Sequence, residues 1–546
     1  WLQMRSITTG QGTRIYSNRI SRGMIPGQVK PLVYSVNIPL TNGQWVALIE
    51  EIIKDTHINP EDLAESFYYQ VYFDMGTFGD IFKSLGLPRE SLEMMMGIIP
   101  PDGTKPSFQP SLQTVSLLPR ILKFIYHKWT ISPRFEKEYS HLFQETQRFR
   151  SMDFSGADPQ ELLGVYEKYK IPQKRITYFN IVIQLLMDLH NTILQRLLAG
   201  IDEDCNLTRD LETREEMRKF DPNFHLTSLH HEFSELLRSI REKILSDGNT
   251  NLQKTPEAED FLQAFNEFLE TFGHLSDSGV DFSYTSWSET PDILLELVSK
   301  HHSTWINNPD VTHFEDLPVR GLKKLILRYF YHRTSNYRLQ REKISSLYTL
   351  GVHIFRKIFL EMGDYLVQNG NLENREDIFY LYLHELQEFA ASKQAGDEKS
   401  LKQKAAYRKK EMKDTAGLTL PELIYDAPPP LEIVKPRKKL RGTPASPGYY
   451  KGVVRHVRGL RDFSKLQQGE ILAVPFTDVG WTPLFAHAGA IIAESGGLLS
   501  HSSIVAREYN IPAVVSVNGI DQLQDGDTIT VDGYKGEISI HERGKV

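Results

Sequence analysis

The feature that most constrains the fold is a change of hydrophobic period late in the chain. From about Trp45 to Gly417, apolar residues recur three and four positions apart, which predicts amphipathic helices. The segment from Ala427 to Arg441 holds three successive prolines and a basic run, which suit a semi-rigid, solvated linker and not a helix. After it the period becomes that of strands. The sequence therefore predicts a large, mainly helical domain, a linker and a small α/β domain.

Four segments carry the helical period most clearly: 234–245, 258–272, 322–331 and 339–366. The span from Tyr178 to Leu198 is apolar almost all round, and its polar residues lie three or four apart, on one face. They are Asn180, Gln184, Asp188, Asn191 and Gln195. Two interpretations of this face stay open: a narrow solvated stripe, or the polar lining of a substrate cavity.

Six short apolar runs follow the linker, and turns such as Asp525-Gly526-Asp527 and Asp532-Gly533 separate several of them. The predicted strands are 452–457, 470–474, 490–493, 513–517, 528–531 and 537–540. Strands and helical segments that alternate in this way predict a compact α/β domain.

Bulk properties exclude several classes of protein. The 546 residues suffice for two to four domains, and the net charge of -7 argues against a nucleic-acid binder. Cys205 is the only cysteine, so no internal disulfide forms, which fits a reducing cytoplasm. No apolar run reaches the roughly 18 residues of a membrane span, and no secretory signal is visible. Since the chain begins at Trp1 and not at methionine, we interpret it as part of a longer polypeptide.

A histidine at the start of a predicted helix is the strongest functional signal. His501 follows two glycines and stands between serines, between the predicted strands 490–493 and 513–517. A neutral imidazole is a nucleophile near pH 7, and a helix N-terminus favours the negative charge of a phosphoryl group. The alternative is a structural histidine that caps the helix. We expect the phosphoryl group to be stabilised by Ser500, Ser502, Gly496, Gly497 and Arg507, with Ser503 as a further hydroxyl; Arg507 is either a distant counter-charge or an exposed helical arginine.

Three motifs in this region resemble the phosphoenolpyruvate-utilising enzymes. Gly496 to Arg507 is similar to their phosphohistidine signature, with Ser502 and Ser503 in place of two alanines. The segment 442–448 resembles the opening of their mobile domain, and 477–483 resembles the segment before its central strand. The resemblance implies that His501 is phosphorylated in turn and that its domain swivels between two active sites.

The domain order resembles that of rifampin phosphotransferase and phosphoenolpyruvate synthase-like proteins. Leu2 to Arg5 is similar to the last strand of an ATP-grasp domain, which would make Gln3 and Arg5 remnants of a nucleotide site. The predicted divisions are a nucleotide-domain tail at 1–20, a helical substrate domain at 21–426, a hinge at 427–441 and a swivelling domain at 442–546.

A further segment, Phe272 to His274 with Asp281 and Trp287, also resembles the family, although Leu275 replaces its usual arginine and Gly279 a frequent acid. An acceptor hydroxyl needs a base and an incoming phosphoryl group needs cations. The substrate candidates are therefore His274, Asp277, Asp281, Arg338 and Arg341. The alternative is a surface loop and a solvated basic face.

These observations favour a fragment of an ATP-dependent, dikinase-type phosphotransferase. By resemblance, ATP and Mg²⁺ are the cofactors, and an N-terminal ATP-grasp domain and a small-molecule acceptor are the partners. We assign no metal ligands, and we expect the isolated chain to be unable to use ATP. The alternatives are a carrier and substrate-binding half that works with a separate ATP-binding protein, or a non-catalytic scaffold. The sequence leaves the acceptor open between a rifamycin, pyruvate and another metabolite.

Overall fold

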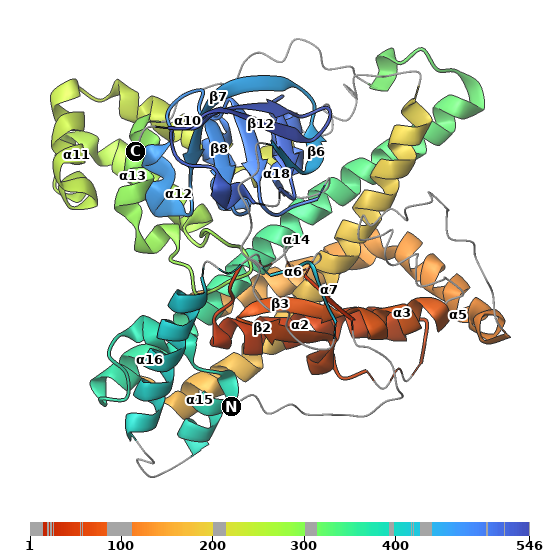
Figure 1. The fold of residues 1–546 in the computed structure, drawn as a ribbon, viewed down its shortest axis with the longest axis horizontal. Coiled ribbons are helices and arrows are strands. Elements are labelled where there is room, and N and C mark those ends of the chain that lie inside the picture. Colours follow the sequence, from red (N-terminus) through yellow and green to blue (C-terminus); the bar gives the residue numbers. More distant parts are fainter. Residues whose placement is uncertain are drawn as a thin grey trace.

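A computed structural model gives the fold (Figure 1). The structure describes residues 15–18, 21, 25, 27–54, 56, 58–84, 112–199, 215–300, 314–391, 398–416, 418, 420–425, 439–497, 501–517 and 519–544. The larger helices are α2 (Pro31–Glu50), α3 (Met75–Ser84), α5 (Leu112–Trp129), α6 (Ile131–Arg150), α7 (Pro159–Leu198), α10 (Pro222–Glu235), α11 (Arg238–Gln253), α12 (Glu259–Phe272), α13 (Pro291–Lys300), α14 (Gly321–Gln368), α15 (Leu383–Ala391), α16 (Glu398–Thr415) and α18 (His501–Glu508). Two short helices are α9 (Glu215–Arg218) and α17 (Thr482–Phe485). The predicted fold class, a large helical region followed by a small α/β domain, is confirmed.

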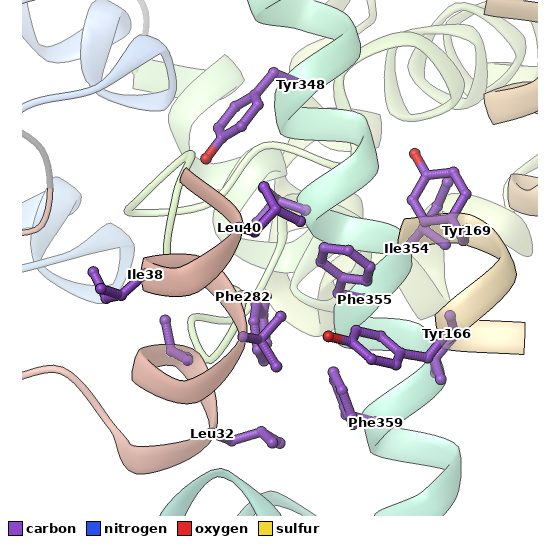
Figure 2. Packing of buried hydrophobic residues seen from close by; sticks show 14 of the residues in the cluster. Leu32, Ile38, Leu40, Tyr166, Tyr169, Phe282, Tyr348, Ile354, Phe355 and Phe359 are labelled. Atoms are coloured by element: carbon purple, nitrogen blue, oxygen red, sulfur yellow. The ribbon is translucent and has the colours of Figure 1, made fainter. Parts of the chain in front are cut away.

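Two long helices, α7 with 40 residues and α14 with 48, form the centre of the helical region (Figure 1). Their aromatic side chains interlock: the ring of Tyr166 lies 5.5 Å from the rings of Phe355 and Phe359. Phe282 stacks on Phe359 at 5.5 Å, and Leu40 of α2 joins the same cluster (Figure 2). This packing fixes one face of α14, the helix that also reaches the candidate site.

A capping residue, Asp158, fixes where α7 begins. Asp158 accepts hydrogen bonds from the backbone N–H groups of Gln160 (2.8 Å) and Glu161 (2.9 Å), and Glu161 accepts one from the backbone of Asp158 (3.1 Å). This is a capping box, with Pro159 at the first helical position.

Replacing Asp158 with alanine is expected to cost about 1 kcal/mol of stability, measured by urea unfolding, with Asp158→Asn as the milder control.

Two helix predictions are corrected. The segments 322–331 and 339–366 belong to one continuous helix, α14, because no proline or glycine lies between Leu322 and Leu350. The segment 234–245 is not one helix: α10 ends at Glu235, and Leu236 is extended (φ -64°, ψ 145°) before α11 begins at Arg238. Periodicity continues across such a break because both helices bury apolar residues, so the pattern alone does not show it.

The helical region also contains a small sheet that the periodicity did not predict. Its strands pair in the order β2 (Ala64–Phe67), β3 (Gln70–Asp74), β1 (Ile15–Ser17), β4 (Leu423–Tyr425). Strands of three to five residues are too short to show alternation, and partners far apart in sequence complete the sheet. From the sequence we placed residues 15–17 in the nucleotide-domain tail. In the structure they pair with β3 on one side and with β4 on the other.

The C-terminal domain is built on an eight-stranded sheet in the order β5-β12-β11-β7-β8-β9-β10-β6. Strands β7 to β10 are parallel neighbours, with antiparallel strands at both ends. The six predicted strands are confirmed, and β5 and β6 are additional. Lys439–Arg441, which we placed in the linker, pair with β12 as β5; residues 427–438 lie outside the described part. The strands are β5 (Lys439–Arg441), β6 (Thr443–Ser446), β7 (Tyr449–His456), β8 (Ile471–Val474), β9 (Ala490–Ala493), β10 (Ala513–Val515), β11 (Thr528–Asp532) and β12 (Glu537–Glu542).

One apolar cluster crosses from the helical region into the sheet domain. Phe265 of α12 and Leu295 of α13 share it with Phe463, Phe485 and Val505 of the sheet domain. In Figure 1, helices α10 to α13 accordingly lie against one side of that domain. The sheet domain is therefore seated on helices that end at Lys300, far before its first strand begins at Lys439.

No helix in the described ranges combines the length and the apolar character that crossing a membrane requires.

Candidate functional site

The candidate site lies where the parallel strands of the sheet domain end. Parallel neighbours present their carboxyl ends at one edge, which is where ligands commonly bind in such sheets. The chains that leave β8 and β9 stay together at this edge: Glu494 N–H donates to Val474 O (3.0 Å) and Ser495 N–H to Pro475 O (2.9 Å). The segment that precedes α18 therefore begins beside the segment that follows β8.

Two serines hold the glycines before α18. Ser503 Oγ donates to Gly497 O (2.6 Å), and Ser516 Oγ, at the end of β10, donates to Gly496 O. Gly496 has φ +126°, a conformation that favours glycine. Helix α18 then begins at His501, so its first backbone N–H groups face the same edge. Ser500 and the side chain of His501 lie outside the described residues.

The other predicted phosphoryl-stabilising residues belong to the frame of α18. Ser502 and Ser503 are buried, at 2% and 0% exposure. Arg507 is not an exposed helical arginine: it is partly buried, and its Nη1 donates to Ala445 O of β6 at 2.9 Å. These contacts fix the helix on the sheet, while the glycines and the helix start remain as the elements at the edge.

The helical region faces this edge with the loop between α12 and α13. Backbone hydrogen bonds from Trp287 to Leu275 and from Ser288 to Gly273, both 2.9 Å, close the loop. Within it, the backbone O of Asp277 accepts the indole N–H of Trp481 at 2.8 Å. The sheet domain is thus docked on the loop that holds three of the predicted substrate residues.

A small cavity lies at this contact. It leaves about 10 Å³ for the centre of a water-sized molecule, which is room for roughly one water. Its lining includes five residues of the helical region and one of the sheet domain: His274, Gly279, Thr349, His353, Arg356 and Asp478. In this arrangement the cavity is closed to any larger molecule.

The two histidines of the cavity are neutral at pH 7. Burial lowers the pKa of His274 to about 3, with repulsion from the His353 ring once that ring is protonated, and burial lowers the pKa of His353 to about 4. The Thr349 hydroxyl donates to Ser346 O (3.0 Å), and its oxygen is hydrogen-bonded to His274 Nε2 at 3.2 Å. These imidazoles are hydrogen-bonding groups, and their low pKa makes them weak bases.

Arg356 lines the cavity and is held by hydrogen bonds to neighbouring groups. It is 2% exposed; its Nε and Nη2 donate to Glu289 at 2.7 Å each, and its Nη1 donates to Phe282 O at 3.2 Å. Glu376 adds a second carboxylate at 3.2 Å. The bidentate pair joins the loop to α14, so the guanidinium is committed to structure.

The remaining substrate candidates separate into two groups. Asp281 is 4% exposed and accepts the backbone N–H of Ser283 (2.8 Å), which makes it a buried turn residue outside the cavity lining. Arg338 donates to Asn191 Oδ1 (3.2 Å) and Arg341 to Gln184 Oε1 (3.3 Å), both on α7. Part of the polar face of α7 thus meets the arginines of α14. Gln3 and Arg5 lie outside the described residues.

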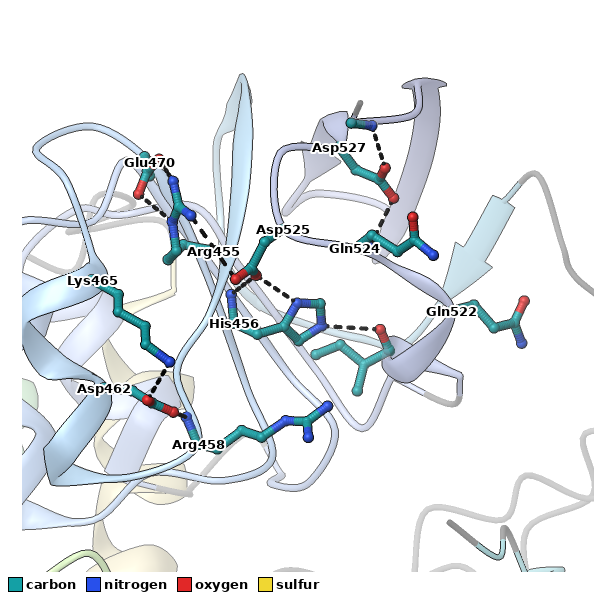
Figure 3. A network of polar contacts seen from close by, with 12 residues as sticks. Arg455, His456, Arg458, Asp462, Lys465, Glu470, Gln522, Gln524, Asp525 and Asp527 are labelled. Atoms are coloured by element: carbon teal, nitrogen blue, oxygen red, sulfur yellow. Dashed lines mark hydrogen bonds and ion pairs between the residues drawn. The ribbon is translucent and has the colours of Figure 1, made fainter. Parts of the chain in front are cut away.

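A second polar cluster in the sheet domain is satisfied within that domain (Figure 3). Arg455 pairs with Glu470 (2.6 Å), and the backbone N–H of His456 donates to Asp525 (2.7 Å). The ring of His456 contacts Asp525 and Ile520 O on its two sides, at 3.1 and 3.4 Å. These contacts hold the end of β7 in place.

Sequence reasoning did not select Thr349, His353, Arg356 or Asp478. Thr349, His353 and Arg356 recur at helical spacing on α14, but a long helix offers many such sets. Asp478 lay in a segment that resembled the family, where no chemistry was assigned to it. No local sequence pattern marks these four residues, because they come together only where the loop at 273–286 packs in the folded protein.

Two family models match parts of the chain. Residues 466–536 match the model of the mobile domain of PEP-utilising enzymes, and residues 190–313 match the model of the fourth domain of rifampicin phosphotransferases. The resemblance to phosphoenolpyruvate-utilising enzymes predicted from the sequence is thereby confirmed.

Three relatives that the chain matches are named as phosphotransferases. The chain is 29% identical over 320 residues to an uncharacterised phosphotransferase, YvkC, of Bacillus subtilis, covering 54% of this chain and 38% of the relative. It is 30% identical over 304 residues to a rifampicin phosphotransferase of Bacillus cereus, covering 51% and 34%. A rifampicin phosphotransferase of Bacillus subtilis is 28% identical over the same length. The chain thus spans little more than a third of the length of these relatives.

Proposed function

We propose that this chain relays a phosphoryl group through His501 to a hydroxyl on a small molecule bound at the helical region. One observation carries the proposal: the sheet edge from which α18 begins at His501 is the edge docked on the loop 273–286 and its cavity. A carrier that moves between two sites must present its nucleophile at such an interface. The match to the mobile domain of PEP-utilising enzymes supports the same assignment.

In the transfer step, the acceptor oxygen forms a bond to phosphorus, the bond from phosphorus to the His501 nitrogen breaks, and the hydroxyl proton is released. The N-terminus of α18 stabilises the negative charge of the bound phosphoryl group. His274 and His353 are placed to orient the acceptor hydroxyl. Since the cavity is water-sized, a rifamycin, pyruvate or any other acceptor enters only when the sheet domain or the loop has moved.

Loading of His501 would use ATP and Mg²⁺ at an ATP-grasp domain beyond this chain. In the described ranges, no group of three or more His, Cys, Asp or Glu side chains is arranged to hold a metal ion. We therefore assign Mg²⁺ no ligand there. The alternative is that a separate ATP-binding protein loads this chain.

The test is acid-labile, base-stable phosphate on the protein after incubation with Mg²⁺ and ATP labelled in its β- and γ-phosphates. We expect the label when an ATP-grasp domain is present, in the same polypeptide or added separately, and none when it is omitted. His501→Ala should abolish the label, and the exposed, distant His384→Ala should retain it. A scaffold would give no label under any condition, and label on His501→Ala would refute the relay. Chasing labelled protein with rifampicin or with pyruvate then identifies the acceptor class.

A further inference from the structure

A glycine of the helical region is hydrogen-bonded to a carboxylate of the sheet domain. Gly279 N–H, in the loop of the helical region, donates to Asp478 Oδ2 of the sheet domain at 2.7 Å. The other oxygen, Oδ1, accepts the backbone N–H of Val479 at 2.7 Å and so caps the short helix that follows. Both carboxylate oxygens are therefore used, one within the sheet domain and one across the interface.

Position 279 has no room for a side chain. A Cβ atom on Gly279 would lie 2.8 Å from Asp478 Oδ2 and 2.8 Å from Thr349 Cγ2, closer than such atoms approach. Gly279 does not have a positive φ, so its backbone conformation is open to any residue. Glycine is needed at this position for space alone, and that space is filled by the carboxylate of Asp478 from the sheet domain and the methyl group of Thr349 from α14.

The neighbouring contacts place the same two segments face to face. The indole N–H of Trp481 donates to Asp277 O at 2.8 Å, and Trp481 is fully buried. A Cβ atom on Gly480 would lie 2.7 Å from Ser276 O, so the two backbones touch there as well. Apolar burial between the domains is non-directional, whereas these polar contacts fix one register.

We propose that the Gly279–Asp478 contact positions the swivelling domain over the cavity and so selects the docked arrangement from which His501 would discharge. This inference rests on the proposed relay for its functional meaning, but the contact itself can be tested without it. Asp478 and Gly279 are positioning residues: they act by holding the edge that bears α18 against the loop 273–286.

The experiment compares Gly279→Ala, Gly279→Val and Asp478→Asn with a matched control, Gly164→Ala. Gly164 lies inside α7 with nothing within 4 Å of an added Cβ. Hydrogen exchange of the segments 275–286 and 476–485 reports docking in the 546-residue chain. We expect exchange in both segments to be about tenfold faster in the three variants, from loss of a hydrogen bond to a charged group, and unchanged in Gly164→Ala. Unchanged exchange in Gly279→Val and Asp478→Asn would overturn the proposal.

A second readout separates positioning from general destabilisation. With an ATP-grasp domain and Mg²⁺-ATP present, weakening the docked arrangement should leave the initial rate of phosphate incorporation at His501 unchanged or raise it. A general loss of structure would lower that rate, and a lower rate in Gly279→Ala would count against the proposal. If the unmodified chain takes up no phosphate, the relay has failed, while hydrogen exchange still decides whether Gly279 and Asp478 hold the domains together.

Discussion

Replacing Arg356 with methionine is expected to lower the free energy of unfolding by about 3–5 kcal/mol. The guanidinium is 2% exposed and forms a bidentate pair with Glu289, whose side chain is 33% exposed. Although burial raises it, the hydrogen bonds from Arg356 hold the pKa of Glu289 below its ordinary value. Removing the cation leaves that carboxylate partly buried without its partner, and the loop 273–286 loses its tie to α14.

Guanidinium chloride unfolding of the whole chain, followed by far-UV circular dichroism, measures this loss. Arg375→Met is the matched control: Arg375 pairs with Asp364 at 3.0 Å, but the two side chains are 46% and 35% exposed, so the cost should stay below about 1 kcal/mol. The double variant Arg356→Met with Glu289→Met should recover most of the stability, because the one carboxylate that still lacks Arg356, Glu376, is 55% exposed and stays solvated. Equal costs for Arg356→Met and Arg375→Met would show that the buried pair has no special weight.

Lowering the pH from 7.5 to 5.0 is expected to lower the free energy of unfolding because of the two histidines that line the cavity. Their folded pKa values, about 3 for His274 and about 4 for His353, lie below the value of about 6.5 in an unfolded chain. Between these values the unfolded chain binds protons that the folded chain does not, so stability falls as the pH falls. At about 1.4 kcal/mol per pH unit, His274 contributes about 2 kcal/mol of loss by pH 5, and the more exposed His353 contributes less.

Unfolding free energies at several pH values test this dependence. His274→Gln and His353→Gln should each reduce the slope of stability against pH below 6.5. His141→Gln should leave the slope unchanged, since the His141 side chain is 72% exposed. A slope that is the same in all three variants would mean that the cavity histidines protonate freely in the folded protein.

The fold class and the strand–helix–strand order around His501 were predicted from the sequence because both depend on local pattern. A strand that ends in two glycines and runs into a short helix is specified by neighbours in the chain. The six predicted strands and the start of α18 at His501 are accordingly present. The small sheet was missed because strands of three to five residues, such as β1 and β4, carry too little pattern and are completed by partners far away in sequence.

Local sequence specified the type of each long element and placed His501 at a helix start, since periodicity and a glycine-rich turn act within one segment. The cavity between the helical region and the sheet domain exists only in the folded molecule. His274 and Asp281 were selected from sequence, but their neighbours His353, Arg356 and Asp478 come from a helix and a domain that lie 70 to 200 residues later. Burial at that junction, which no single segment encodes, makes the histidines neutral and brings the carboxylate of Asp478 onto the bare backbone of Gly279.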